Sequence, residues 1–177
     1  MKHVLLCDEN GAMLGKTDIL RAHSGEGMLH RAFSVFVFRA NRSELLLQRR
    51  STKKPLFGGL WTNTCCSHPQ EEQDIVQAGQ QRLQEECGFT CPLASYVSFV
   101  YRAPDPKGNG TEYEYDTILI GDLADDGPEL EPDPQEISEL CWKPVENVVR
   151  DLVRDPRKYA PWFPIALHAI LRRTHGN

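Results

Sequence analysis

Several common features are missing from this chain, and each absence narrows its class. No apolar run among the 177 residues approaches the roughly 20 residues that a membrane-spanning helix needs. The first residues do not resemble a secretory signal, because four apolar residues lead directly into Asp8-Glu9-Asn10-Gly11. Neither internal repeats nor an interdomain linker divide the sequence. We therefore expect a single domain over residues 1–177, located in the cytoplasm and independent of membranes.

Positive charge is scarce. The chain has 20 Lys and Arg residues against 25 Asp and Glu residues, which gives a formal net charge of -5. Binding to nucleic acid needs a basic surface, so we expect no nucleic-acid partner. The one dense basic run contains Arg49, Arg50, Lys53 and Lys54, which could still bind a small anion.

The six cysteines are expected to be free thiols rather than a disulfide framework, since the chain has no secretory signal. Two of them are adjacent in the stretch WTNTCCSHPQ (61–70). Cys66 and His68 would share a face of an extended segment, and a thiol becomes a useful acid or base when metals or cations shift its pKa. Simple buried packing is the alternative for the pair, and it is our interpretation of Cys65.

The hydrophobic pattern predicts a mixture of strands and helices. Helices are expected at 74–86, stopped by Gly88, and at 161–173, with Trp162 near its start. The acidic, Pro-rich segment 124–135 is expected to be a loop. Strands are expected at 3–7, 33–38, 44–50, 93–102, 111–121 and 137–145, with 33–38 and 44–50 forming one hairpin and 93–102 and 111–121 another. This order predicts an α+β fold, with helices packed on a sheet.

Acidic residues alternate in the stretch TEYEYD (111–116). Alternate residues of a strand share a face, so Glu112, Glu114 and Asp116 would point one way. Successive carboxylates there lie roughly 6–7 Å apart, close enough for the glutamates to converge on one cation. Taken alone, the stretch is more typical of a solvated acidic face.

Three histidines, His23, His30 and His68, lie outside the obvious core runs. Together with Glu112 and Glu114 they would suit Zn²⁺ or Mn²⁺, because imidazole and carboxylate ligands match such ions. The spacing of His23 and His30 is not a recognised zinc signature. Each histidine by itself is therefore also consistent with a surface residue or a satisfied polar residue.

The helix expected at 74–86 ends in Glu85-Glu86-Cys87-Gly88. This ending resembles the end of the Nudix box, whose helix carboxylates bind the divalent metals of a diphosphate substrate. Nudix hydrolases normally have an Arg-Glu pair where this chain has Gln81-Arg82, so a cation replaces a carboxylate that is important for hydrolysis. The pattern indicates a Nudix scaffold turned away from hydrolysis, although paired glutamates on a helix are often just solvent-facing.

Taken together, these residues resemble the type I isopentenyl-diphosphate isomerase family, a branch with the Nudix fold. The combination W-T-N-x-x-C-x-H-P with a downstream E-x-E is highly specific, and the resemblance covers nearly the whole chain. It implies a single Nudix-like α/β/α sandwich with a mixed β-sheet, an N-terminal extension and C-terminal helices. The matching stretches, in family order, are AHSGEGMLHRAFSVFVF (22–38), LLLQRRSTKKPLFGGLWTNTCCSHP (45–69), EECG (85–88), YRAPDPKGNGTEYEYD (101–116) and PWF (161–163).

The resemblance also implies a role for each site residue. Cys66 and Glu114 would stand on opposite sides of a five-carbon unit, with Tyr101 beside Glu114 and Trp162 covering the pocket. Glu86, with the backbone carbonyl of Cys66, would hold Mg²⁺ against the diphosphate. The diphosphate oxygens would face the cations Arg50, Lys54 and Arg82. One Mn²⁺ or Zn²⁺ would be bound by His23, His30, His68, Glu112 and Glu114.

The implied activity is the metal-dependent interconversion of isopentenyl diphosphate and dimethylallyl diphosphate by a monomer. One departure is that many members have a lysine where this chain has Ile19, so the residue that makes this diphosphate contact is an open question. A Nudix hydrolase of a nucleotide or another diphosphate is the alternative, and a catalytically inactive Nudix binding module is the third.

Overall fold

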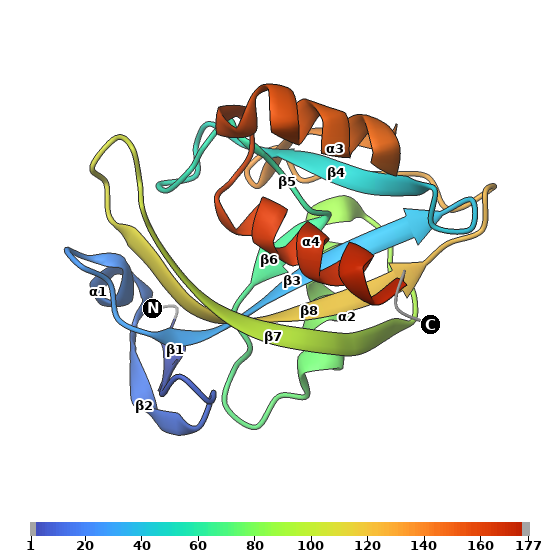
Figure 1. Cartoon of the computed structure of the whole chain (residues 1–177). Helices are drawn as coiled ribbons and strands as arrows, with labels where there is room; N and C mark the ends of the chain where they lie inside the picture. The colour runs from blue at the N-terminus through green and yellow to red at the C-terminus, as the bar shows by residue number, and fades with distance from the viewer. Residues whose placement is uncertain (1–2, 175–177) are drawn as a thin grey trace.

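The computed structural model describes residues 3–174, which form one mixed β-sheet with helices on both sides (Figure 1). No helix in this range is long and apolar enough to span a bilayer. The strands are β1 (His3–Cys7), β2 (Met13–Asp18), β3 (His30–Arg39), β4 (Glu44–Arg50), β5 (Trp61–Thr62), β6 (Cys65–Ser67), β7 (Leu93–Pro104), β8 (Thr111–Asp122) and β9 (Ile137–Pro144). The helices are α1 (Ile19–His23), α2 (Ile75–Cys87), α3 (Val145–Arg154), the 3₁₀ turn η1 (Pro156–Lys158) and α4 (Trp162–Thr174).

Strand β3 is the centre of the sheet. It runs parallel to β8 from the pair His30–Glu114 to the pair Phe38–Asp122, and antiparallel to β6 and to the start of β4. Its side chains are buried on both faces, as expected for a strand covered by helices on each side. The sheet is therefore mixed, as the sequence predicts.

Two apolar cores lie on opposite faces of the sheet. On one face, Phe36 and Phe38 of β3 pack with residues of α4 such as Phe163. On the other, Val35 and Val37 pack with Leu83 of α2. Figure 1 shows α4 in front of the sheet and α2 behind it. On β8, Ile118 and Ile120 pack in the core on the α4 side of the sheet. Alternate residues of a strand share a face, so the side chains of Glu112, Glu114 and Asp116 lie on this side as well.

Helix α2 begins and ends where the sequence predicts. The Asp74 side chain accepts hydrogen bonds from the N–H groups of Val76 and Gln77, which caps the first turn. Gly88 ends the helix with a φ of 80°, a left-handed conformation that glycine adopts without steric cost. The helix therefore has fixed ends, and its last turn presents Arg82, Glu85 and Glu86.

The predicted strands and both predicted helices are present, with ends displaced by a few residues. The expected hairpin of 33–38 and 44–50 forms only at its turn, where Phe38 pairs with Leu45 and Arg39 with Glu44. Strand β4 pairs with β9 along its whole length, and beyond the turn it also pairs with β5, while β6 takes its place beside β3. The sequence does not predict β2, β5, β6, α1 or α3, which are short or lack a strong apolar period.

Candidate active site

Four of the five predicted transition-metal ligands converge. His23 ends α1, His30 begins β3, His68 follows β6, and Glu114 lies on β8 opposite His30. One ligand atom from each lies within 4.8 Å of all the others. The Nε2 atoms of His30 and His68 are 3.1 Å apart, and His68 Nε2 is 3.0 Å from a Glu114 oxygen. Residues from four separate elements therefore meet at one point.

The backbone orients two of these imidazoles. Nδ1 of His23 is 2.7 Å from the Ile19 carbonyl, and Nδ1 of His30 is 2.7 Å from the Met28 carbonyl. Since a carbonyl oxygen only accepts, Nδ1 is the donor in both cases. Nε2 of each ring therefore faces the cluster, and it binds a metal once any proton on it is displaced, as in many histidine ligands whose other nitrogen is fixed by a carbonyl.

Glu112, the fifth predicted ligand, lies at the edge of this group. Its carboxylate is 2.7 Å from His23 Nε2, but it does not belong to the set of four. Burial opposes protonation of His23, yet the hydrogen bond and charge of Glu112 outweigh it and raise the pKa of His23 to about 9. Imidazole nitrogens with carboxylate oxygens fit a borderline divalent ion such as Zn²⁺ or Mn²⁺.

Glu114 also contacts a second functional group. The Tyr101 hydroxyl donates to Glu114 at 2.5 Å, and both side chains are buried. Burial raises the pKa of Tyr101 well above its usual value, so the phenol keeps its proton. Burial also disfavours the Glu114 anion, but hydrogen bonds from His30 and His68 more than offset this and hold its pKa well below the usual range. Tyr101 and Glu114 thus form a buried, hydrogen-bonded pair of titratable groups beside the histidines.

Cys66 lies on β6, next to Ser34 of β3. Its Sγ is 3.6 Å from Ser34 Oγ and 3.1 Å from Asn63 Nδ2. Ser34 Oγ in turn donates to Asp116 at 2.7 Å. Burial, with a smaller contribution from the charge of Asp116, raises the pKa of Cys66 to about 12, which favours the protonated thiol. Its neighbour Cys65 is fully buried in the core under α2, as predicted.

Trp162 closes this region from α4. Its Nε1 donates to Asn63 Oδ1 at 3.1 Å, and the ring is almost completely buried. The ring centroid lies 5.8 Å from that of Tyr101 and 5.5 Å from that of Phe57. An aromatic wall therefore stands over the thiol and the Tyr101–Glu114 pair.

Arg50 is a buried cation without an acidic partner. The residue is 8% exposed, and among residues 3–174 no carboxylate forms an ion pair with it. Within the same residues, the one hydrogen bond of its side chain joins Nη2 to the Leu56 carbonyl at 3.1 Å. Its Nε is buried without a partner, and its Cζ lies 5.4 Å from the Trp162 ring centroid. A buried charge is costly unless it is paired, so this arrangement fits an anionic ligand.

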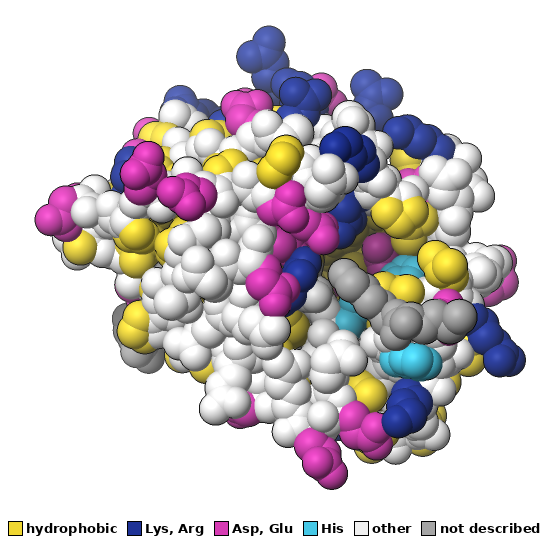
Figure 2. Space-filling model, turned by 180° about the vertical axis from the view of Figure 1, so that it is seen from behind, with side chains coloured by type: hydrophobic (Ala, Val, Ile, Leu, Met, Phe, Trp, Pro, Cys, Tyr) yellow, Lys and Arg dark blue, Asp and Glu magenta, His cyan; other side chains and the backbone are white. Residues whose placement is uncertain are grey.

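A cavity of about 180 Å³ borders this cation. Arg50 and Lys54 line it together with His23 and Glu112, so two of the predicted anion contacts border the same cavity as one histidine of the cluster. Figure 2 shows acidic, basic and histidine side chains gathered around a hollow on this face of the molecule.

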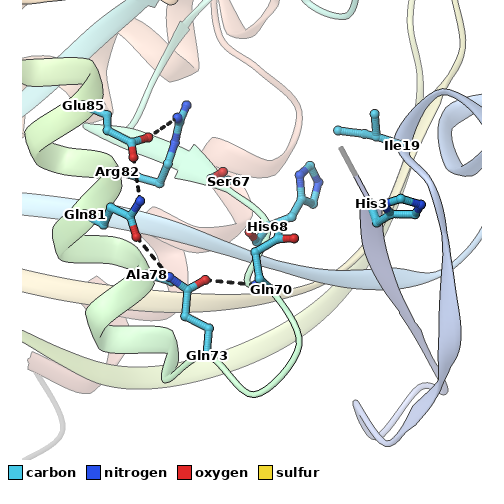
Figure 3. Close-up of a pocket in the computed structure, with 10 residues that line it drawn as sticks. All are labelled: His3, Ile19, Ser67, His68, Gln70, Gln73, Ala78, Gln81, Arg82 and Glu85. Carbon is cyan, nitrogen blue, oxygen red and sulfur yellow. Dashed lines mark hydrogen bonds and ion pairs between the residues drawn. The ribbon is translucent and has the colours of Figure 1, made fainter. Parts of the chain in front are cut away.

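Arg82, which the sequence resemblance predicts to replace a Nudix carboxylate, is surrounded by acidic side chains. Its guanidinium binds Glu85 at 2.6 Å, and it also pairs with Glu86 and, at 3.4 Å, with Glu136. Glu136 pairs with Lys54 as well. Figure 3 shows Arg82 and Glu85 on one wall of a cavity of about 290 Å³, with His68 opposite. Burial raises the pKa of Glu86, although Arg82 opposes this.

Ile19 lines both cavities as an apolar side chain. Two basic residues, Lys16 and Arg21, are nearby in the sequence, and Lys16 pairs with Glu71 at 2.7 Å on an exposed strand. The lysine position of the family therefore contributes no charge here.

Sequence reasoning did not assign Ser34, Asn63 or Glu136 to the site. Asn63 lies inside the quoted WTNTCC stretch, so its position in the motif is a signal that could have identified it. Ser34 and Glu136 gave no signal in the sequence. Ser34 reaches the site because β3 pairs with β6, and Glu136 reaches it because the loop before β9 passes beside Lys54.

Comparison with known proteins identifies the fold and the family of the chain. The model of the NUDIX domain family matches residues 28–163. The solved MutT protein of Methanosarcina mazei Go1 has a TM-score of 0.66 at 14% identity, covering 87% of this chain and 100% of that one. A Nudix hydrolase of M. smegmatis, RenU, has a TM-score of 0.59 at 21% identity, covering 98% and 94%. At these identities the solved structures show the fold alone, which is that of the Nudix proteins.

Curated relatives are much closer in sequence. The isopentenyl-diphosphate Delta-isomerase of Halorhodospira halophila is 43% identical over 92% of this chain and 91% of its own length. That of Nocardia farcinica is 40% identical over 98% and 99%. The chain therefore belongs to the NUDIX family and, within it, to the isopentenyl-diphosphate Delta-isomerase family.

Proposed function

We propose that this protein catalyses the 1,3-allylic interconversion of isopentenyl diphosphate and dimethylallyl diphosphate. The observation that carries the proposal is the unpaired, buried Arg50 beside two proton-transfer groups, Cys66 and the Tyr101–Glu114 pair, under the Trp162 ring. An anion bound at Arg50 would bring a short apolar tail between those two groups. The names of the relatives support this choice of substrate.

The diphosphate would be anchored by Arg50, Lys54 and Arg82. Glu86 and the Cys66 carbonyl would hold Mg²⁺ against it, which fits the excess of carboxylates over cations around Arg82. Binding at the charged end holds the five-carbon unit at one position, so the proton transfers become effectively intramolecular.

The reaction needs one proton added and another removed. From the Glu114–Tyr101 side a proton is delivered to the terminal alkene carbon, and positive charge develops at the tertiary carbon. Cys66 then removes a proton from the carbon on the other side, and the electron pair of that C–H bond forms the new double bond. A Zn²⁺ or Mn²⁺ held by His23, His30, His68, Glu112 and Glu114 would supply positive charge that increases the acidity of the Glu114 carboxyl group.

The cationic intermediate must be kept from water. The rings of Trp162 and Tyr101 offer π-faces that stabilise a cation by about 2 kcal/mol when desolvated. The same rings exclude water, which would otherwise add to the tertiary carbon.

The proton states of the metal-free protein correspond to one stage of this cycle. Burial keeps the pKa of Cys66 high and two histidines keep that of Glu114 low, so the thiol is protonated and the carboxylate is not. This is the distribution that follows forward isomerisation, when Cys66 has accepted a proton. The enzyme must therefore exchange protons with water before the next forward turnover.

Incubation with isopentenyl diphosphate and Mg²⁺ in D2O, followed by NMR, tests the proposal. We expect dimethylallyl diphosphate to form and deuterium to enter the product. Metal-replete protein that forms no isomer would overturn the function. Release of phosphate or nucleotide from a panel of diphosphates would instead favour a hydrolase, which Arg82 at the carboxylate position argues against.

The Cys66→Ala variant tests the role of the thiol. We expect kcat to fall by about 10²–10⁴-fold, the usual contribution of an acid–base group, while the fold persists. Cys141→Ala is the matched control, because Cys141 is half-buried on β9 and does not line the site. Near-normal turnover by Cys66→Ala would remove the thiol from the mechanism.

A monomer working in the cytoplasm remains part of our proposal.

A further inference from the structure

Asn63 connects the thiol to the aromatic wall. It lies between β5 and β6 and is fully buried. Its side-chain amide makes six contacts of hydrogen-bonding length with five atoms, because the Cys66 sulfur lies near both ends of the amide. Nδ2 lies 3.1 Å from the Val35 carbonyl, 2.8 Å from the Cys65 carbonyl and 3.1 Å from Cys66 Sγ, and Oδ1 lies 2.7 Å from Thr62 Oγ1, 3.1 Å from Trp162 Nε1 and 3.3 Å from Cys66 Sγ.

The partners fix which end of the amide is which. Indole Nε1 of Trp162 can only donate, so it must face Oδ1. The carbonyls of Val35 and Cys65 can only accept, so they must face Nδ2. Both ends of Asn63 are therefore assigned by chemistry, and the amide cannot turn over without losing three hydrogen bonds.

This orientation presents the Cys66 sulfur with a donor and an acceptor on one rigid group. A thiol can donate its proton to Oδ1, whereas a thiolate can accept a hydrogen bond from Nδ2. Nδ2 has two hydrogens for three acceptors, and its bond to the Val35 carbonyl is longer than its bond to Cys65. The Val35 bond is thus the weaker competitor, and a thiolate could replace it without moving the amide.

We propose that Asn63 is a positioning residue for the Cys66 sulfur. It holds the sulfur in place both before and after the sulfur accepts a proton, and it fixes the position of the sulfur relative to the Trp162 ring. This inference rests on the proposed function, in which the sulfur passes between these two states within the pocket. The shared Oδ1 atom is what ties the sulfur to the ring above it. A misplacement of about 1 Å can cost 10²-fold in rate, so the coupling bears directly on turnover.

Two substitutions separate the donor from the acceptor. Asn63→Asp keeps the shape and an acceptor for Trp162 and the thiol, but it removes the Nδ2 donor. Asn63→Leu keeps the approximate volume and removes both. We expect each to lower kcat by about 10²-fold with a KM for isopentenyl diphosphate within about threefold of wild type, because the diphosphate site is not touched.

Thr62→Val is the matched control. Thr62 is as buried as Asn63 and donates to the same Oδ1 at 2.7 Å, but none of its hydrogen bonds reaches the sulfur. It should lose a comparable amount of stability in thermal unfolding, yet keep kcat within about threefold of wild type. An equal loss of kcat in Thr62→Val and Asn63→Leu would mean that Asn63 acts only through the fold, and the inference would be wrong.

The infrared S–H stretching band gives a readout that stability alone would not change. The difference spectrum between wild type and Cys66→Ala isolates the band of this thiol. We expect it to move toward the position of a free thiol in Asn63→Leu. If Asn63 variants do not fold, Trp162→Phe keeps a ring and removes a competitor for Oδ1, so the band should show a stronger hydrogen bond.

The outcomes distinguish this inference from the proposed function. Wild-type protein that does not isomerise the substrate contradicts the function itself. Wild-type isomerisation with unchanged kcat in both Asn63 variants, or an S–H band that moves in neither Asn63→Leu nor Trp162→Phe, overturns only the role of Asn63.

Discussion

We expect the buried Arg50 side chain to favour the binding of an anion but to lower the stability of the folded protein when no anion is bound. Its guanidinium is buried without a carboxylate partner, so in the ligand-free protein it loses hydration and gains little in return. With an anion in place the same group becomes a charge-assisted donor in a site from which water is largely excluded. Binding energy and folding energy are therefore opposed at this residue.

Substitution Arg50→Met should separate the two effects. We expect the KM for isopentenyl diphosphate to rise about 10-fold or more, since hydrogen bonds to charged groups contribute about 1.5–3 kcal/mol. We also expect the free energy of unfolding without ligand to be unchanged or higher. Arg49→Met, at an exposed position on the same strand, is the control for both measurements. A lower stability combined with a normal KM would contradict the assignment.

His23 predicts a pH dependence of metal binding. Glu112 raises its pKa to about 9 against the effect of burial, so at pH 7 the ring of the metal-free protein carries a proton that a metal must displace. We expect about one proton to be released on binding Zn²⁺ or Mn²⁺ at pH 7, and affinity to rise with pH up to about 9. Calorimetry in two buffers with different ionisation enthalpies measures this release, and Glu112→Gln should reduce it.

The sequence predicts some site residues far better than others. His23, His30, His68 and Glu114 could be named because the family resemblance supplied the set, although the histidine spacing alone left them ambiguous. Asn63 acts through a hydrogen bond to Trp162, 99 residues further along the chain. Such a contact depends on how α4 packs over the sheet, which no local pattern encodes.

Among the elements, α2 depends on an unusually close approach to the sheet. A Cβ atom added at Gly79 would lie 2.5 Å from Leu119 Cδ1 and 2.9 Å from Leu93 Cδ1. Leu119 is fully buried and has little room to move. Glycine thus lets the helix that carries Arg82 and Glu86 lie against β7 and β8.

Gly79→Ala should destabilise the protein although alanine favours helices. Overpacking costs typically about 1–3 kcal/mol and helix propensity returns at most about 1 kcal/mol, so we expect a net loss of unfolding free energy. The helix would move away from the sheet, which should also raise the KM. Gln77→Ala, exposed on the same helix, should change stability by less than about 0.5 kcal/mol. Denaturant unfolding of both variants measures the difference, and a stabilised Gly79→Ala would contradict the close approach.

Long apolar elements are predictable here because burial on both faces gives them a strong signal. The run 33–38 and the helix at 74–86 are found almost where the sequence predicts. The short strands β5 and β6 are not, since two or three residues carry no period. The expected hairpin of 33–38 and 44–50 is limited to its turn because the short strand β6, which the sequence does not reveal, pairs with β3 in place of β4.

On the scale of the whole molecule, the metal cluster joins parts of the chain that are far apart in sequence. His23 comes from α1, His30 from β3, His68 from the segment after β6 and Glu114 from β8. The Nε2 atoms of His30 and His68 are 3.1 Å apart, and His68 Nε2 is 3.0 Å from a Glu114 oxygen. A cation bound by these atoms would crosslink four parts of the fold.

Removal of the metal should therefore lower global stability. A ligand that binds only the folded state stabilises it by about 2.7 kcal/mol at a concentration 100 times its Kd. We expect a chelator to lower the Tm, and readdition of Zn²⁺ or Mn²⁺ to restore it. His30→Ala should abolish the restoration, whereas His168→Ala, at an exposed position on α4, should leave it intact. If both variants respond to the metal as wild type does, the ion that stabilises the fold binds outside this cluster. If only His30→Ala loses the response, the ion binds at the cluster and holds the four elements around the pocket together.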